Sequence, residues 1–177
     1  GYFNIPKILE LALFNGYDNM SGAQLGPETG YGYDFKSYEE LWEAFCTQMR
    51  YFLDIKIRGN LVIEKIYAQE MPVPFLSVLT NDCISRGKDY NTGGARYNTS
   101  YIQGVGIGTI TDCLAAVKYN VFDHSRFTMK ELMDALINDF EGYGKIHNLV
   151  SNRTPKYGND DEYADSIMEE VFSFYYK

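Results

Sequence analysis

The stretch GGARYNTSYIQG, residues 93–104, interrupts a chain whose flanking segments show helical periodicity. It holds two adjacent glycines, a cation at Arg96 and several neutral polar side chains, so it has the apolar period of neither a helix nor a strand. Two tyrosines and an isoleucine are unusual in a loop that only faces water. We therefore expect an irregular segment packed into the body of the protein, whose polar groups are satisfied within a structural turn or by a ligand.

Outward from this stretch, start and stop signals predict a mostly helical chain. The helices are expected to begin at Asn4, Ser37, Phe75, Thr109, Thr128 and Asn159 or Asp160. Stop signals are expected at Gly16, Pro72 with Pro74, and Gly87. The helix from Ser37 is long and is expected to bend near Gly59. Strands are expected to be few and short, with residues 97–103 the best candidate.

Apolar side chains at helical spacing are expected to face the core. The principal ones are Ile5, Ile8, Leu9, Leu13, Leu41, Phe45, Met49, Leu53, Leu132, Leu136, Ile137, Ile167, Val171 and Phe172. Cys83 belongs to the same class, because it follows Phe75, Leu76 and Leu79 on one helical face.

Composition argues against several functional classes. The formal net charge is −8 with no run of basic residues, which disfavours binding to nucleic acid. No apolar run is long enough to span a membrane, and no export signal opens the sequence. Cys46, Cys83 and Cys113 fit no zinc or CxxC spacing, so we expect reduced, buried thiols in a cytoplasmic protein.

Three local patterns are interpreted as structural features and not as functional sites. Gly104–Gly108 before a helix resembles a phosphate loop, but Thr109 stands where a dinucleotide motif needs glycine, so a tight turn is expected. His124 and His147 are far apart and are expected at the surface or in caps. The acidic run 160–162 suits the start of a helix. No metal site is predicted.

Four motifs in register resemble one family. They are MPVPFLS (71–77), CISRGKD (83–89), GGARYN (93–98) and TPKYGNDD (154–161). Together they are similar to the pyruvate formate-lyase-like domain of glycyl radical enzymes, over nearly all of the chain. The stretches GYFNIPK (1–7) and YNTSYIQGVGIGT (97–109) most resemble the branch of that family that dehydrates trans-4-hydroxy-L-proline.

The resemblance implies an α/β, helix-rich fold that forms part of a ten-stranded barrel, within its second half. It also implies a thiyl-forming cysteine in a Gly-Cys-Val-Glu loop and a glycyl radical in an Arg-Val-x-Gly-Tyr motif, installed by an activating enzyme that uses S-adenosylmethionine and an iron–sulfur cluster. Neither motif is present here. We therefore expect residues 1–177 to be an internal part of one such domain, with the cysteine loop upstream and the radical domain downstream, and to be inactive alone.

The resemblance also implies which residues meet a small-molecule substrate. Tyr2 follows the expected cysteine loop, and Asn98, Thr99 and Ser100 lie where relatives bring a loop towards the active site. Cys83 is followed by Ile84 and Ser85 in place of Val and Glu, so it is interpreted as a core residue. The parent is expected to be a homodimeric carbon–oxygen lyase. Alternatives are a glycerol or propanediol dehydratase, another eliminase, or a non-catalytic helical interaction domain.

Overall fold

Helices form most of the chain in the computed structural model, which describes residues 1–176. The chain divides into a small unit, Gly1–Tyr2 with Leu53–Gln103, and a large unit that contains the rest of the described residues. The helices are α1 (Ile5–Leu13), α2 (Tyr38–Glu70), α3 (Pro74–Leu79), α4 (Cys83–Arg86), α5 (Ile107–Val117), α6 (Met129–Ile137), α7 (Gly144–Asn152) and α8 (Glu162–Tyr176).

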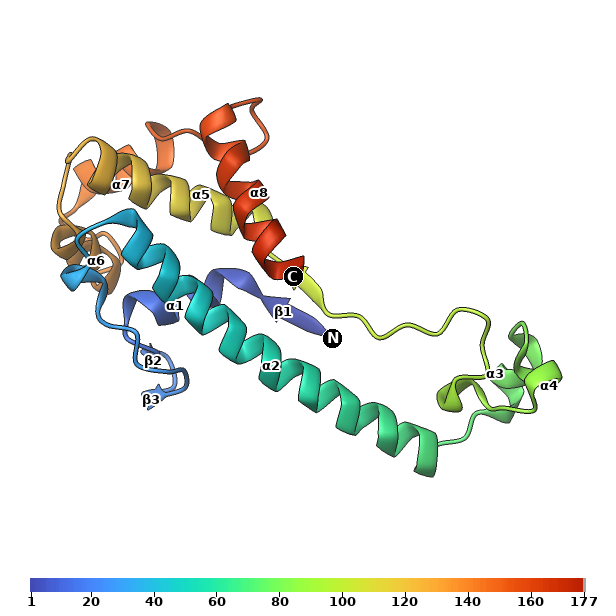
Figure 1. The fold of residues 1–177 in the computed structure, drawn as a ribbon. Helices are drawn as coiled ribbons and strands as arrows, with labels where there is room; N and C mark the ends of the chain where they lie inside the picture. Colours follow the sequence, from blue (N-terminus) through green and yellow to red (C-terminus); the bar gives the residue numbers. More distant parts are fainter. Residues whose placement is uncertain (177) are drawn as a thin grey trace. The chain divides into compact units, whose positions relative to one another are not determined.

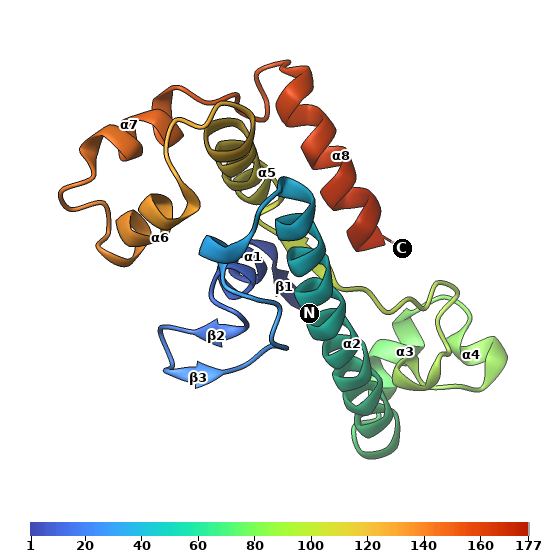
Figure 2. The same ribbon diagram turned by 60° about the vertical axis from the view of Figure 1, so that its left-hand side comes forward.

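Strands are short, as expected from the sequence. They are β1 (Tyr2–Asn4), β2 (Tyr17–Asp18), β3 (Ala23–Gln24) and β4 (Gln103–Val105). In the described residues they form two separate pairs, β1 with β4 and β2 with β3. The second pair is an antiparallel hairpin with Tyr17 opposite Gln24, and Figure 2 shows it extending from the end of α1.

The core of the large unit lies among α1, α5, α8 and the first half of α2. Figure 1 shows α5 beside α8, and the largest fully buried side chains come from these elements. They include Ile5, Leu41, Phe45, Met49, Ile110, Leu114 and Val171. The predicted inward positions Ile5, Leu41, Phe45, Met49 and Val171 are therefore confirmed, because these apolar residues recur at helical spacing and are buried. Leu53, further along α2, is only half-buried.

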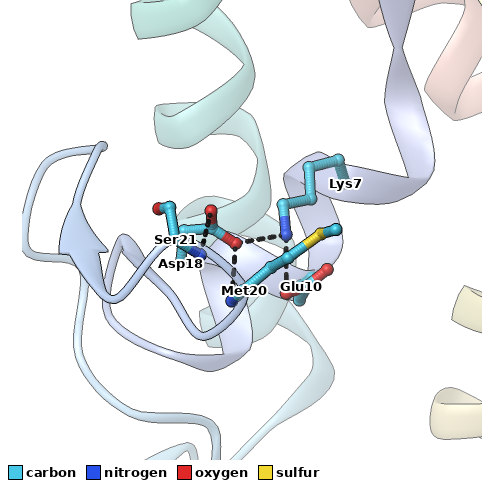
Figure 3. A network of polar contacts seen from close by, with 5 residues as sticks. All are labelled: Lys7, Glu10, Asp18, Met20 and Ser21. Atoms are coloured by element: carbon cyan, nitrogen blue, oxygen red, sulfur yellow. Dashed lines mark hydrogen bonds and ion pairs between the residues drawn. The ribbon is translucent and has the colours of Figure 1, made fainter.

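A polar network fastens the start of α1 to the β2–β3 hairpin (Figure 3). Lys7 donates to Glu10 at 2.7 Å and to the buried Asp18 carboxylate, which also accepts from the backbone nitrogens of Met20 and Ser21. The hydrogen bond from Lys7 and those from Ser21 hold the pKa of Asp18 well below its ordinary value of 3.8. Because the folded pKa is depressed, this stabilisation is complete above the unfolded pKa and is lost only as the pH falls through the folded value.

The capping box at Thr128 is complete. The Thr128 hydroxyl accepts from the backbone nitrogen of Glu131 at 3.1 Å, and the Glu131 carboxylate accepts from the Thr128 nitrogen at 2.7 Å. The box at Ser37 is only half formed, because its hydroxyl lies 3.4 Å from the Glu40 nitrogen while Glu40 accepts from Lys36 instead. The two caps therefore differ in strength although their sequence patterns match.

Replacing Thr128 with alanine is expected to lower the stability of α6 by about 1 kcal/mol, because the backbone nitrogen of Glu131 loses its side-chain acceptor. Amide hydrogen exchange over residues 129–133 in the full-length protein measures this. Ser37→Ala is the matched comparison and should accelerate exchange in the first turn of α2 less. Equal effects at the two caps would contradict the difference in geometry.

Several predicted boundaries are wrong. The segment after Pro74 is two helices and not one, because Asp82 adopts a left-handed backbone (φ 75°) just before α4. Helix α5 begins at Ile107, two residues before Thr109, since Gly106 (φ 86°) occupies its N-cap position. The final helix begins at Glu162, slightly later than expected. Helix α7 was not predicted from the sequence.

Other expectations fail at the level of side chains. Leu136, Ile137 and Phe172 are 39%, 65% and 54% exposed, although helical spacing predicts them to be inward. Cys113 is exposed, whereas Cys46 and Cys83 are buried as expected. Burial raises the pKa of Cys46 to about 12, so this thiol stays protonated at neutral pH. Leu136, Ile137 and Cys113 line one apolar groove of about 740 Å³ in the large unit, which explains their common exposure.

The second half of α2 carries apolar side chains around its whole circumference. Helical hydrogen bonding continues through Gly59, where the sequence predicts a bend. Beyond it and just before it, seven large apolar side chains are about half exposed: Ile55, Ile57, Leu61, Val62, Ile63, Ile66 and Tyr67. Charged residues such as Asp54, Lys56 and Glu64 alternate with them. So many exposed large apolar side chains on one helix are typical of a surface that contacts other protein.

Candidate functional site

The residues predicted to bind substrate all lie in the small unit. Asn98, Thr99 and Ser100 line an open cavity of about 340 Å³, together with residues of α2 and of the 3₁₀ turn η2 (Tyr90–Thr92). The other lining residues are Ile63, Glu64, Tyr67, Tyr90 and Asn91. Tyr2 is 74% exposed and is not among the residues that line this cavity.

The loop of residues 88–102 begins at Asp89, a half-buried carboxylate that accepts several hydrogen bonds. Its carboxylate accepts from the Val73 nitrogen at 2.9 Å, the Ser77 hydroxyl at 2.7 Å and the Asn91 nitrogen at 2.9 Å. The hydroxyl of Ser77 in turn accepts from the Tyr90 nitrogen at 2.8 Å. The hydrogen bond from Ser77 is the largest cause that lowers the pKa of Asp89. The beginning of the loop is therefore fixed to α3 by an ionised carboxylate.

Gly93 and Gly94 allow the chain to turn sharply after Asp89, as expected. Gly93 has φ 82°, in the left-handed region that favours glycine. A Cβ atom on Gly94 would clash with the backbone oxygen of Lys88 and would lie 2.9 Å from that of Asp89. Only glycine lets the two backbone segments approach this closely, so a structural role explains both residues.

A second anchor follows at Arg96, which binds Asp82 at the start of α4. Its Nε and one terminal nitrogen each donate to a different Asp82 oxygen at 2.9 Å, which is the bidentate fork geometry. The Arg96 nitrogen also donates to the Asn81 oxygen at 3.1 Å, and Arg86 donates to the Ala95 oxygen at 2.9 Å. The hydrogen bond from Arg96 is the main cause that lowers the pKa of Asp82.

At the far side of the cavity, the Ser100 hydroxyl donates to the carboxylate of Glu64 on α2. Between Arg96 and Ser100, the side chains of Asn98 and Thr99 make no hydrogen bond to the described residues and are exposed. Their amide and hydroxyl groups are therefore available to a ligand.

Tyr2 is placed by the residue before it. The Gly1 oxygen accepts from the Gln103 nitrogen at 2.8 Å, and the Gly1 amino group donates to the Tyr101 oxygen at 3.3 Å. These bonds set the backbone of Tyr2 beside the end of the loop that begins at Asp89. Tyr2 and the stretch 98–100 thus belong to one locally connected structure within the small unit.

The segment is irregular as predicted, but the expectation that it is packed into the body is wrong for most of it. Among residues 93–104 only Gly94 and Ala95 are buried, while Tyr97 and Tyr101 are 86% and 71% exposed. The expected strand over residues 97–103 is also wrong, since only Gln103 is in a strand. The anchors hold the loop at its ends, and the side chains between them are left uncovered within the described residues.

The structure agrees with the preferred explanations of the glycine run and of the two histidines. A Cβ atom on Gly106 would lie 2.6 Å from the ring of Pro6, so this glycine serves the close packing of α1 against the turn. His124 contacts the Tyr119 oxygen at 2.8 Å after η3, a π-helical turn over Lys118–Asp123. Within residues 1–176 no cluster of three metal-ligating side chains occurs, and no helix is both long and apolar enough to cross a membrane.

The sequence alone did not identify the residues that hold the loop. Asp89 had a usable signal, because aspartate in a polar stretch is typical of a turn in which the side chain accepts from the backbone nitrogen two residues later. Glu64 and Asp82 had none, since their partners lie 36 and 14 residues away along the chain. Cys83 is 2% exposed in α4, which confirms its interpretation as a core residue.

Comparisons with known proteins agree with the motifs. The family model "Pyruvate formate lyase-like" matches residues 1–177. The chain is 64% identical over 176 residues to trans-4-hydroxy-L-proline dehydratase of Clostridioides difficile, covering 99% of this chain and 22% of that protein. It is 35% identical over 175 residues to (2S)-3-sulfopropanediol dehydratase of Klebsiella oxytoca, covering 98% of this chain and 21% of that protein.

Solved structures give the same result. The crystal structure of hydroxyproline dehydratase from C. difficile, with trans-4-hydroxy-L-proline bound, matches with a TM-score of 0.95 over 99% of this chain and 22% of that one. The glycerol-bound form of the B12-independent glycerol dehydratase from Clostridium butyricum matches at 38% identity with a TM-score of 0.90, over 98% of this chain and 22% of that one. The chain thus spans about one fifth of the length of these relatives. It belongs to the pyruvate formate lyase-like family of glycyl radical enzymes.

Proposed function

We propose that the protein of which this chain forms part dehydrates trans-4-hydroxy-L-proline by glycyl radical chemistry. The observation that carries the proposal is the 64% identity to the C. difficile dehydratase over nearly the whole chain, against 38% to the glycerol dehydratase. The difference is large enough to favour one substrate class within the family. The runner-up is a dehydratase of glycerol or 1,2-propanediol, whose solved relatives also share the fold.

The chain would contribute framework and part of one pocket wall to this reaction. The cysteine that becomes a thiyl and the glycine that stores the radical would lie upstream and downstream of residues 1–177. An activating enzyme using S-adenosylmethionine and an iron–sulfur cluster would install the radical, and the whole protein would be a cytoplasmic homodimer. The radical supplies abstraction of a hydrogen atom from the carbon next to the one that carries the hydroxyl.

The proposed tasks of this chain are binding and orientation. Tyr2 would direct its phenol towards the substrate, where a hydroxyl can donate to a carboxylate or accept from an amine. Asn98 and Thr99 would offer an amide and a hydroxyl that have no other partner within the described residues. Ser100 already donates to Glu64, so it would present only the lone pairs of its oxygen.

The test of the proposed function uses the full-length protein, activated anaerobically with S-adenosylmethionine and a cognate activating enzyme. Trans-4-hydroxy-L-proline, glycerol and 1,2-propanediol are supplied separately, and each dehydrated product is quantified by chromatography. Turnover of hydroxyproline alone is expected. Turnover of either diol in its place would establish the runner-up. A protein that acquires the radical but turns over none of the three would favour another eliminase, and one that acquires no radical would favour a non-catalytic interaction domain.

The isolated chain is expected to remain without a radical under the same conditions. A radical eliminase needs both a thiyl-forming cysteine and a radical-storing glycine in their motifs, and this sequence contains neither motif. Electron paramagnetic resonance should therefore show no glycyl doublet from residues 1–177, while the full-length protein gives one. A doublet from the isolated chain would refute the assignment of the radical glycine to a flanking segment.

A further inference from the structure

The stretch Tyr97–Thr99 lies between Arg96 and Ser100, whose side chains are each bound by a carboxylate, and these two interactions anchor the stretch. On one side Arg96 is held by Asp82, and on the other Ser100 is held by Glu64. We propose that Asp82, Arg96 and Glu64 are positioning residues, which fix both ends of this stretch so that Asn98 and Thr99 meet the substrate in one orientation. The inference rests on the proposed function, which it deepens by naming residues that act through the loop without touching substrate.

The Asp82 anchor restricts the loop in direction as well as in distance. Two hydrogen bonds of 2.9 Å to the two Asp82 oxygens fix the plane of the Arg96 guanidinium. A lysine ammonium at this position would leave the orientation of the side chain free. The Arg96 nitrogen is also bound, at 3.1 Å to the Asn81 oxygen, so both backbone and side chain of this residue are fixed. Asp82 itself is 24% exposed, and Arg86 lies 3.7 Å from it as a second cation.

The Glu64 anchor ties the loop to a different element. Glu64 lies on α2, 36 residues before Ser100, so the hydrogen bond closes a long excursion of the chain. Both residues line the same cavity as Asn98 and Thr99. The anchors thus lie at the start of α4 and on α2, while the side chains of Asn98 and Thr99 make no hydrogen bond within the described part of the chain.

Fixing both ends of so short a stretch removes conformational freedom before the substrate arrives. A loop that is free at one end must be ordered when it binds, and this cost weakens binding. Misplacement of contact groups by about 1 Å can also lower rates by roughly a hundredfold. Loss of one anchor should therefore raise KM. It should also lower kcat if the altered orientation of the contact groups persists in the transition state.

The experiment measures the steady-state kinetics of variants of the activated full-length protein with trans-4-hydroxy-L-proline as substrate. Asp82→Asn and Glu64→Gln each keep the size of the side chain but remove a charge, and Arg96→Lys keeps the charge but removes the fork. Each is expected to raise KM, with kcat/KM reduced roughly tenfold to a hundredfold, while the glycyl radical content is unchanged. Asp82→Glu, which retains the carboxylate, should recover part of the loss.

The control is another ion pair of the small unit. Asp54 and Arg58 are paired at 2.8 Å on α2 and are not among the residues that line the cavity. Asp54→Asn should leave kcat and KM as in the unmodified protein. If Asp82→Asn and Glu64→Gln match Asp54→Asn in both constants, the anchors do not position the loop and the inference is overturned.

A second measurement does not depend on turnover. Amide hydrogen exchange over residues 97–100 of the full-length protein should be faster in Asp82→Asn and Glu64→Gln than in Asp54→Asn. Unchanged exchange overturns the inference even if the enzyme is active. If the protein turns over glycerol and not hydroxyproline, the proposed substrate is wrong, but faster exchange together with a raised KM for glycerol still supports the anchors.

Discussion

Replacing Phe45 with alanine is expected to destabilise the core of the large unit by about 3–5 kcal/mol. The Phe45 side chain is fully buried, and its ring lies 5.6 Å from that of Trp42 between centroids. Removal of the ring leaves a cavity that neighbouring helices can fill only in part, so lost transfer free energy and lost contacts add. Amide hydrogen exchange of residues 41–49 in the full-length protein reports the change as a free energy of opening.

The graded comparison for this prediction is Phe45→Leu. Leucine preserves much of the volume and all of the apolar character, so the expected loss is below about 1.5 kcal/mol. Because Leu41 and Met49 share the same face of α2 and are also fully buried, exchange should accelerate along this whole segment in Phe45→Ala. An alanine variant that is no more labile than the leucine variant would contradict the packing described here.

Tyr2→Phe in the full-length protein is expected to lower kcat/KM for hydroxyproline by roughly tenfold to a hundredfold, or about 1–3 kcal/mol. The change removes one hydroxyl and keeps the ring, so shape is conserved. If the hydroxyl pairs with a polar group of the buried substrate, that group loses its partner. Steady-state kinetics of the activated protein measures the effect, with radical content as the internal check.

Cys83→Ala is the matched control for Tyr2→Phe, because it tests the other residue that could be assigned a catalytic role. Cys83 is almost fully buried in α4, so its loss should cost about 1–2 kcal/mol of stability. Radical formation and turnover should survive. A folded Cys83→Ala protein without turnover, beside an unaffected Tyr2→Phe protein, would show that the two roles have been assigned the wrong way round.

The sequence predicted the helix caps and turns that depend only on residues close to them in the chain. The complete capping box at Thr128 and the left-handed Gly16 and Gly87 act within a few residues, and each lies where the sequence places it. The buried series Leu41, Phe45 and Met49 follows from helical period alone. Asp82 escaped prediction because a left-handed aspartate is uncommon, and it divides into two what the apolar spacing describes as one helix.

The exposure of the loop of residues 88–102 could not be predicted from its composition. Tyrosines and an isoleucine within a polar stretch indicate that these side chains contact other residues. They do not indicate which segment of a protein makes that contact. The anchors of that loop escaped prediction for a related reason, since Glu64 and Asp82 resemble ordinary surface carboxylates until the fold brings Ser100 and Arg96 to them. Contacts between residues far apart in the chain depend on the tertiary structure.

The apolar circumference of the second half of α2 has a practical consequence for anyone who produces residues 1–177 by themselves. Seven large aliphatic and aromatic side chains between Ile55 and Tyr67 would stand half in water, a surface that native monomers rarely leave open. Such a polypeptide should self-associate at working concentrations, bind hydrophobic dyes and engage chaperones that capture unfinished chains. Aggregation of this polypeptide would then result from the exposed apolar side chains of α2 and not from misfolding of the helix.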